Sequence, residues 1–228
     1  FCPAKKDLNF KGFNSMLQKG NIVVLNMNIA EYKNLSKIIA TYLKLDFQSE
    51  IMYRLSNSKS APSAFICDEY AEYVTKTDAD FFSLSREAKC INIVSTQSYS
   101  SLKNTLKDET AVRVICQNLI NKIWFRTDDI FTIEEAQKQL GKENKQYLSK
   151  SISENAKETK FSYITNSLNS QNSSITESIN TYTQKDFIYD TNFFTQSLET
   201  FSALTFLSDG SQIFKPTKLK MFPYFKKG

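Results

Sequence analysis

The sequence predicts an α/β domain in which a mainly parallel sheet is flanked by helices and ends in antiparallel strands at its C-terminal edge. Two observations carry this prediction. Short β-branched and apolar runs alternate with helical patterns between residues 21 and 125, and residues 202–222 have the pattern of a hairpin. With 228 residues the chain can bury one sizeable core, so we expect a single domain over residues 1–228.

The alternating pattern begins with NIVVLNM at residues 21–27, a predicted buried strand that follows Gly20. A long helix is expected next, ending near Arg54, because its apolar residues recur at helical spacing. A loop is predicted over 56–62. The remaining elements of this part are strands at 63–67, 90–96 and 122–125, and helices near 78–88 and over 108–119.

The second half of the chain opens with a short capped helix, predicted to begin at Thr132 and to end at Gly141. Residues 149–186 are then crowded with Ser, Thr and Asn. They form either a flexible linker or a polar loop or hairpin insertion, and their strand-like alternation favours the hairpin. A short helix over 191–199 leads to SALTFL and KLKMF, which flank the turn SDGS as an antiparallel hairpin.

The composition excludes several classes of chemistry. The chain has no histidine, which removes Ser-His-Asp and Cys-His nucleophile systems, histidine metal sites and histidine acid–base catalysis. The four cysteines are widely spaced, so they predict neither a metal or redox motif nor a disulfide framework. We expect reduced thiols that serve as small core residues in a reducing compartment: Cys2, Cys67, Cys90 and Cys116.

Charge and hydropathy give weaker indications. A net charge of +5 is too mild to indicate a nucleic-acid-binding protein. No apolar run approaches the roughly 20 residues of a membrane helix, and no signal-peptide pattern is present. Because the first residue is Phe1, we expect the chain to be a piece of a longer protein.

Polar residues follow two of the predicted strands. Asp68 and Glu69 come after the strand at 63–67, and Gln97 follows the strand at 90–96. Ligands of open α/β sheets bind beyond the carboxyl ends of the strands, so these side chains are candidates for a common site. Taken alone, each of these residues is more often a solvated residue at the end of a strand than part of a functional site. Arg86 lies in the predicted helix between these strands, where an arginine taken alone is most often a surface residue.

Together, this order of residues suits nucleotide hydrolysis. An aspartate that ends an apolar strand can hold the magnesium shell, and a neighbouring glutamate can polarise the attacking water. An amide on the next strand, such as Gln97, can sense the γ-phosphate. A guanidinium such as that of Arg86 can stabilise charge in the transition state.

Three segments, SAFICDEYAEY, SLSREAKCINIVSTQSYSSL and NKIWFRTDD, resemble the C-terminal motor segment of the TraG/TraD family of type IV secretion coupling ATPases. FICDEY is similar to the Walker B strand of that family, and STQSYSSL to its glutamine-containing sensor motif. The resemblance is specific over about residues 63–130 and looser across 20–225. It implies a RecA-like motor that assembles into a hexameric ring.

The resemblance also implies roles and partners. Asp68 would hold Mg²⁺ of Mg-ATP through water, Glu69 would activate water, Gln97 would be the sensor, and Arg86 would reach the nucleotide of a neighbouring subunit. Such motors use ATP to pass single-stranded DNA with its relaxase towards a type IV secretion channel. They work at the cytoplasmic face of the bacterial plasma membrane, with relaxosome and channel proteins as partners.

One departure from the family is clear. The phosphate-binding loop G-x-x-x-x-G-K-S/T does not occur in the sequence. We therefore expect this chain alone to hydrolyse ATP negligibly and to be the C-terminal part of the motor domain. Two alternatives stay open: a non-hydrolysing binding module that docks relaxosome or channel proteins, and a fragment of an FtsK- or HerA-like DNA translocase. The lysine-rich tail at 215–228 is a candidate DNA contact, although a solvated basic tail is the simpler interpretation.

Overall fold

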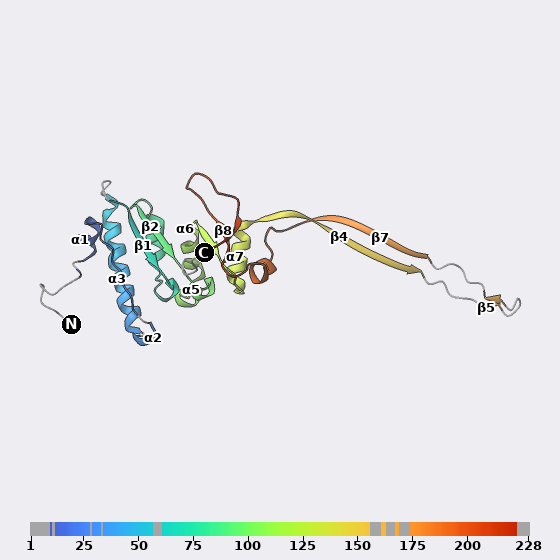
Figure 1. The fold of residues 1–228 in the computed structure, drawn as a ribbon, viewed down its shortest axis with the longest axis horizontal. Helices are drawn as coiled ribbons and strands as arrows, with labels where there is room; N and C mark the ends of the chain where they lie inside the picture. The colour runs from blue at the N-terminus through green and yellow to red at the C-terminus, as the bar shows by residue number, and fades with distance from the viewer. Residues whose placement is uncertain are drawn as a thin grey trace. The chain divides into compact units, whose positions relative to one another are not determined.

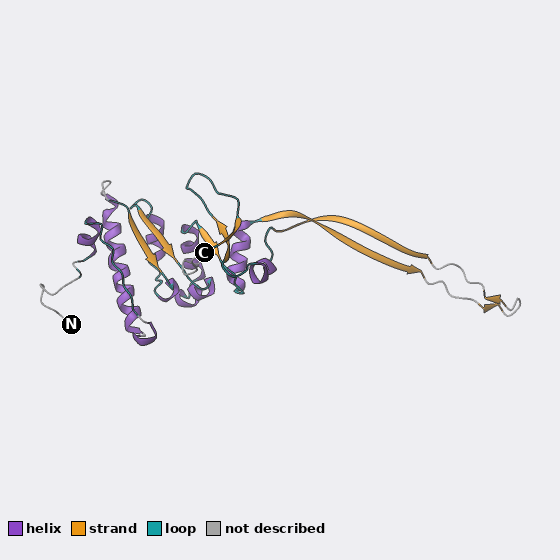
Figure 2. Cartoon of the chain, viewed as in Figure 1, coloured by secondary structure: helices purple, strands orange, loops and turns teal. Residues whose placement is uncertain are grey.

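The computed structural model describes residues 10, 12–27, 29–32, 34–56, 61–155, 161–162, 167–168 and 174–222. The described residues form two compact units (Figures 1 and 2). The first unit comprises the described parts of 1–134 and 191–228, and the second those of 135–190. The loop predicted at 56–62 lies mostly outside the described residues.

The first unit contains most of the predicted elements. Helices α3, α4 and α6, strands β1, β2 and β3, and the pair β8 and β9 confirm the corresponding predictions. Its elements are α1 (Phe13–Gln18), α2 (Ile29–Tyr32), α3 (Asn34–Tyr53), η2 (Arg54–Ser56), β1 (Ser63–Cys67), η3 (Tyr70–Glu72), α4 (Asp78–Leu84), β2 (Cys90–Val94), α5 (Tyr99–Leu106), α6 (Glu109–Asn118), β3 (Lys122–Trp124), the start of α7 (Ile130–Leu140), η4 (Phe193–Ser197), β8 (Ser202–Phe206) and β9 (Thr217–Lys220).

Strands β1 and β2 pair in parallel, with Ser63 opposite Cys90 and Cys67 opposite Val94. Helix α3 lies against one face of this pair, where Phe47 stacks on Phe65 at 5.8 Å between ring centroids (Figure 1). The core of this layer consists of aliphatic and aromatic side chains from α3, η3, α4, α5 and α6.

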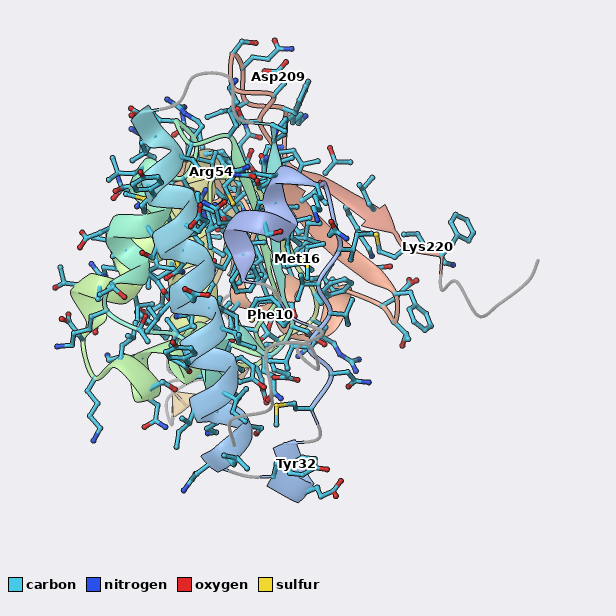
Figure 3. All side chains as sticks on the ribbon, turned by 90° about the vertical axis from the view of Figure 1, so that its left-hand side faces the viewer. Phe10, Met16, Tyr32, Arg54, Asp209 and Lys220 are labelled. Carbon is cyan, nitrogen blue, oxygen red and sulfur yellow. The ribbon has the colours of Figure 1, made fainter. Side chains whose placement is uncertain are left out.

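The carboxyl end of α3 is tied directly to β1. Arg54, which follows the last residue of α3 (Figure 3), donates a hydrogen bond from Nη1 to Ser63 Oγ at 3.1 Å. Since Ser63 is the first residue of β1, this contact fixes where the strand begins relative to the helix.

A second sheet contains β3, β8 and β9, with β8 in the centre and both pairings antiparallel. All five residues of β8 are buried, whereas those of β9 are exposed. Burial on both faces explains why SALTF is a continuous run without polar alternation. The predicted C-terminal hairpin is confirmed, and it places β9 at the edge of the sheet.

The strand predicted at 21–27 is wrong. These residues have no regular secondary structure, and none of the described strands pairs with them. Ile22 and Val24 are 89% and 79% exposed. A β-branched run favours an extended backbone, but a strand also needs a hydrogen-bonded neighbour, and the described residues supply none here.

One helix is missing from the predictions, and the start of another differs. Helix α5 was not predicted, because its sequence YSSLKNTL is polar and only Leu102 and Leu106 are buried. The helix starts after Ser98, whose hydroxyl oxygen accepts a hydrogen bond from Ser101 N at 3.1 Å and caps the helix. Helix α7 begins at Ile130 rather than at Thr132. Asp129 is its cap, with Oδ2 accepting from Thr132 N at 2.9 Å.

The second unit is a long antiparallel hairpin. Strands β4 (Lys142–Asn155) and β7 (Ser174–Phe187) pair over 14 residues each, and two short strands, β5 (Phe161–Ser162) and β6 (Ser167–Leu168), lie beyond them. The ladder starts directly after Gly141, whose φ of 85° is the left-handed conformation that ends helix α7. The hairpin thus begins seven residues earlier than the polar composition suggested.

The described cysteines, Cys67, Cys90 and Cys116, are not in disulfides. Burial raises the pKa of the Cys67 and Cys90 thiols to about 11, so both stay protonated at neutral pH and are poor nucleophiles. None of the helices in the described part of the chain combines the length and the apolar character of a membrane span.

Candidate functional site

The parallel register brings Asp68 and Ser95 to the same edge of the sheet. The last pair of the ladder is Cys67 with Val94, so the residues that follow lie next to each other. Ser95 N donates to Cys67 O at 3.0 Å, and the Ser95 hydroxyl donates to Asp68 Oδ1. The backbone N–H of Glu69 donates to the same carboxylate oxygen at 2.9 Å. Asp68 is therefore held from two directions.

Glu69 takes a backbone conformation that is uncommon for a residue with a side chain. Its φ of 48° and ψ of 43° lie in the left-handed region. This turn directs the Glu69 side chain towards Gln97, whose Nε2 lies 3.4 Å from Oε2 and 3.5 Å from Oε1. Three of the four predicted site residues, Asp68, Glu69 and Gln97, thus come together at the carboxyl ends of β1 and β2.

Arg86 does not join this group. It lies in the turn that leads into Cys90, the first residue of β2, and its side chain is exposed. Asp68 and Gln97 follow the other ends of the strands. Because β2 has five residues that each advance the chain by about 3.3 Å, the two edges are separated by roughly 17 Å. Within one chain, Arg86 is therefore on the wrong edge to contact a ligand held by Asp68.

The hydrogen bonds to Asp68 keep its side chain ionised. The Ser95 hydroxyl and then the Glu69 N–H lower the pKa of Asp68 below its ordinary value, because both donate to the charged form. Ser95 was not among the residues predicted for the site. Its place directly after the apolar run CINIV is the signal that could have identified it.

Substituting Ser95 by alanine is expected to raise the Asp68 pKa towards about 3.9, measured by NMR titration of the carboxyl carbon. In the native chain, the lowered pKa of Asp68 stabilises the fold at pH values above the pKa of the unfolded chain, about 3.9. This stabilisation is lost as the pH falls through the lower pKa of Asp68 in the folded chain. Ser83→Ala is the matched control, since Ser83 donates to the Asp80 carbonyl and not to Asp68. An Asp68 pKa that stays the same in Ser95→Ala would contradict the assignment.

A cavity of about 780 Å³ lies beside Gln97. Its wall includes Ser100, the carboxylates Asp128 and Asp129, and the ring of Phe131, and none of the described residues that line it is a lysine or an arginine. Burial would raise the pKa of Asp129, but hydrogen bonds from Ser100 and Thr132 outweigh burial and lower that pKa. The Asp129 carboxylate at this wall disfavours phosphate groups and favours neutral or cationic ones.

The donor set at the sheet edge suits a magnesium ion held through water. Mg²⁺ keeps several of its water ligands and needs only one or two carboxylates when phosphates supply the rest. An ionised, exposed Asp68 next to a serine hydroxyl fits this role. In the described part of the chain there is no cluster of three or more side chains that would form an all-protein metal site.

Comparisons with known proteins identify the family of the chain. Residues 62–188, more than half of the chain, match the sequence model of the family described as the TraM recognition site of TraD and TraG. The chain belongs to the TraG/TraD family. The match covers the β1–β2 layer and both long strands of the hairpin.

A solved structure, described as the bacterial conjugative coupling protein TrwBdeltaN70 in an unbound form, has the same fold. The TM-score is 0.60 at 12% sequence identity, and the match covers 92% of this chain and 43% of that one. The chain thus spans less than half the length of that coupling protein. A search of curated protein sequences gives no match. The predicted fold class, an α/β fold with parallel strands, flanking helices and antiparallel strands towards the C-terminus, is confirmed.

Proposed function

We propose that this TraG/TraD-family chain is the C-terminal part of a motor that uses ATP to deliver single-stranded DNA with its relaxase to a type IV secretion channel. The observation that supports this proposal is the grouping of Asp68, Glu69 and Gln97 at one sheet edge. The site of action would be the cytoplasmic face of the bacterial plasma membrane.

Each residue has a chemical task in this proposal. Mg-ATP, when bound, supplies the phosphoanhydride bond that is hydrolysed. Asp68 holds the magnesium shell through water, since its carboxylate is ionised and exposed. Glu69 takes the proton of the attacking water as general base. Gln97, within 3.5 Å of the Glu69 carboxylate, orients that water and the γ-phosphate.

The position of Arg86 supports a hexameric ring as part of the proposal. On the opposite edge of the sheet, Arg86 is exposed and lies too far along the strands to reach the Asp68 edge of its own chain. A head-to-tail arrangement of copies joins different surfaces of neighbouring subunits, and in the proposed ring this edge of one subunit faces the Asp68 edge of the next. Arg86 then stabilises transition-state charge at the neighbour's nucleotide.

The decisive experiment is Glu69→Gln in the complete gene product that contains these residues. Loss of the general base is expected to lower the rate of ATP hydrolysis about 100-fold or more, with nucleotide binding retained. Glu72→Gln is the control, because Glu72 is paired with Lys37 at the surface. Equal hydrolysis by wild type and Glu69→Gln would refute the role of Glu69 as general base. Rapid, Glu69-dependent turnover by this chain alone, which lacks the phosphate-binding loop, would instead refute the proposal that the chain is only a part of the motor.

A second function, docking of a relaxosome protein, is favoured by a separate observation. The family match is named for TraM recognition and includes strands β4 and β7 of the hairpin. A TraM-type partner is expected to bind this chain in the absence of nucleotide. Titration of that partner against the chain, with and without ATP, separates this function from the hydrolytic one.

A further inference from the structure

A buried charged cluster lies directly behind the Asp68–Glu69 turn. Lys44 of α3 and Asp78 at the start of α4 form an ion pair with N–O distances of 2.6 and 2.7 Å. Their side chains are 3% and 0% exposed. Tyr70, the residue after Glu69, donates its hydroxyl hydrogen to Asp78 Oδ2 at 2.6 Å and is itself fully buried.

The cluster satisfies both charges with short contacts. Besides Lys44 and Tyr70, Asp78 accepts hydrogen bonds from Thr75 N and from Gln48 Nε2, both at 3.0 Å. Lys44 Nζ also donates to the Tyr73 carbonyl at 2.7 Å and to Thr75 Oγ1 at 2.9 Å. These contacts attach the loop from Tyr70 to Asp78 to helix α3 at several points.

Protonation in the cluster follows from burial. Burial lowers the pKa of Lys44, and the charge and hydrogen bonds of Asp78 oppose that shift. Burial and the neighbouring Asp78 both raise the pKa of Tyr70 far above its ordinary value. The phenol therefore keeps its proton and remains a donor to Asp78 throughout the range in which proteins work.

Tyr70 connects this cluster to the candidate site. Its backbone N–H donates to Ser95 O at 2.8 Å, and its ring packs against Phe82 at 5.9 Å between centroids. Glu69 therefore stands between two fixed residues, Asp68 and Tyr70. A left-handed conformation is unfavourable for a residue other than glycine and persists only where its surroundings enforce it.

We propose that Tyr70, fixed by the Lys44–Asp78 pair, is a positioning residue that keeps the Glu69 carboxylate beside Gln97. This inference rests on the hydrolytic part of the proposed function. Lys44, Asp78 and Tyr70 touch neither substrate nor magnesium in this scheme; they act only through the backbone of the Glu69 turn.

The test is Tyr70→Phe, which removes one hydroxyl and keeps the buried ring. Tyr73→Phe is the matched control, since Tyr73 joins the cluster through its backbone carbonyl and not through its hydroxyl. In this chain, amide hydrogen exchange at residues 69–73 is expected to accelerate at least tenfold in Tyr70→Phe, while exchange in the rest of the core is unchanged. In the complete gene product, kcat for ATP hydrolysis is expected to fall at least tenfold, with KM within twofold.

The possible outcomes separate this inference from the proposed function. If Glu69→Gln abolishes hydrolysis and Tyr70→Phe matches wild type and Tyr73→Phe in kcat, the positioning role is refuted and the motor function stands. Acceleration of exchange throughout the core would also refute it, because the hydroxyl would then stabilise the whole unit and not the turn. If Glu69→Gln has no effect on hydrolysis, the proposed function fails, and the exchange experiment still decides whether Tyr70 fixes the turn.

Discussion

Replacing Lys44 by methionine is expected to destabilise the chain by about 3–5 kcal/mol, because it leaves the Asp78 carboxylate buried without a counter-charge. Asp78 is fully buried and lies between α3 and the loop before α4, where water does not replace the lost ammonium group. Methionine retains most of the volume of lysine, so the loss of stability results from the missing charge and not from a cavity. Urea unfolding followed by circular dichroism measures the change.

Lys37→Met provides the matched control. It is the same substitution in the same helix, but the Lys37–Glu72 pair is solvent-exposed, with 44% and 39% of the two side chains accessible. Exposed pairs contribute about 0–1 kcal/mol. Equal stabilities of Lys37→Met and Lys44→Met would show that the buried pair does not hold α3 and α4 together.

Leu204→Ala is expected to lower the free energy of unfolding by about 2–5 kcal/mol. Leu204 is fully buried in β8, the central strand of its sheet, and pairs with Trp124 on one side and Lys218 on the other. With neighbours on both faces and both edges, the structure cannot collapse around the truncated side chain. Thermal or urea unfolding of the purified chain gives the difference.

Leu219→Ala is the comparison variant for this strand. Leu219 lies on edge strand β9 of the same sheet and is 42% exposed, so the same truncation removes less buried surface. We expect a loss of about 1 kcal/mol or less. A loss at Leu219 as large as that at Leu204 would contradict the assignment of β8 as the buried centre.

The sequence was most informative where local pattern and tertiary pairing agree. Both SAFIC and CINIV are short, mainly apolar runs that are followed by polar residues, and pairing them in parallel was enough to bring Asp68 and Gln97 to one edge. NIVVLNM at 21–27 has the same local pattern and forms no strand. Strand formation depends on a neighbour, and composition does not reveal whether a neighbour is present.

The buried cluster could not be predicted, for a different reason. A lysine within a helix and an aspartate at the start of another are usually surface residues, and each of Lys44 and Asp78 fits that pattern locally. The pair forms because α3 packs against the loop that precedes α4, bringing together residues 34 positions apart. Ser95 is an intermediate case. The predicted strand at 90–96 includes Ser95, whereas β2 ends at Val94, and the hydrogen bond from Ser95 to Asp68 depends on the register of the two strands.

The position of the hairpin in the chain has a consequence for synthesis. Trp124 of β3 pairs with Leu204 of β8, and the whole β4–β7 ladder lies between them in sequence. During translation the hairpin therefore leaves the ribosome before β8 does, and its two strands can join while β3 still lacks its partner. The three-stranded sheet is completed last. Because the entropy of closing a loop grows by only about 0.6 kcal/mol for each doubling of its length, the intervening hairpin can vary greatly in length at little cost to that final step.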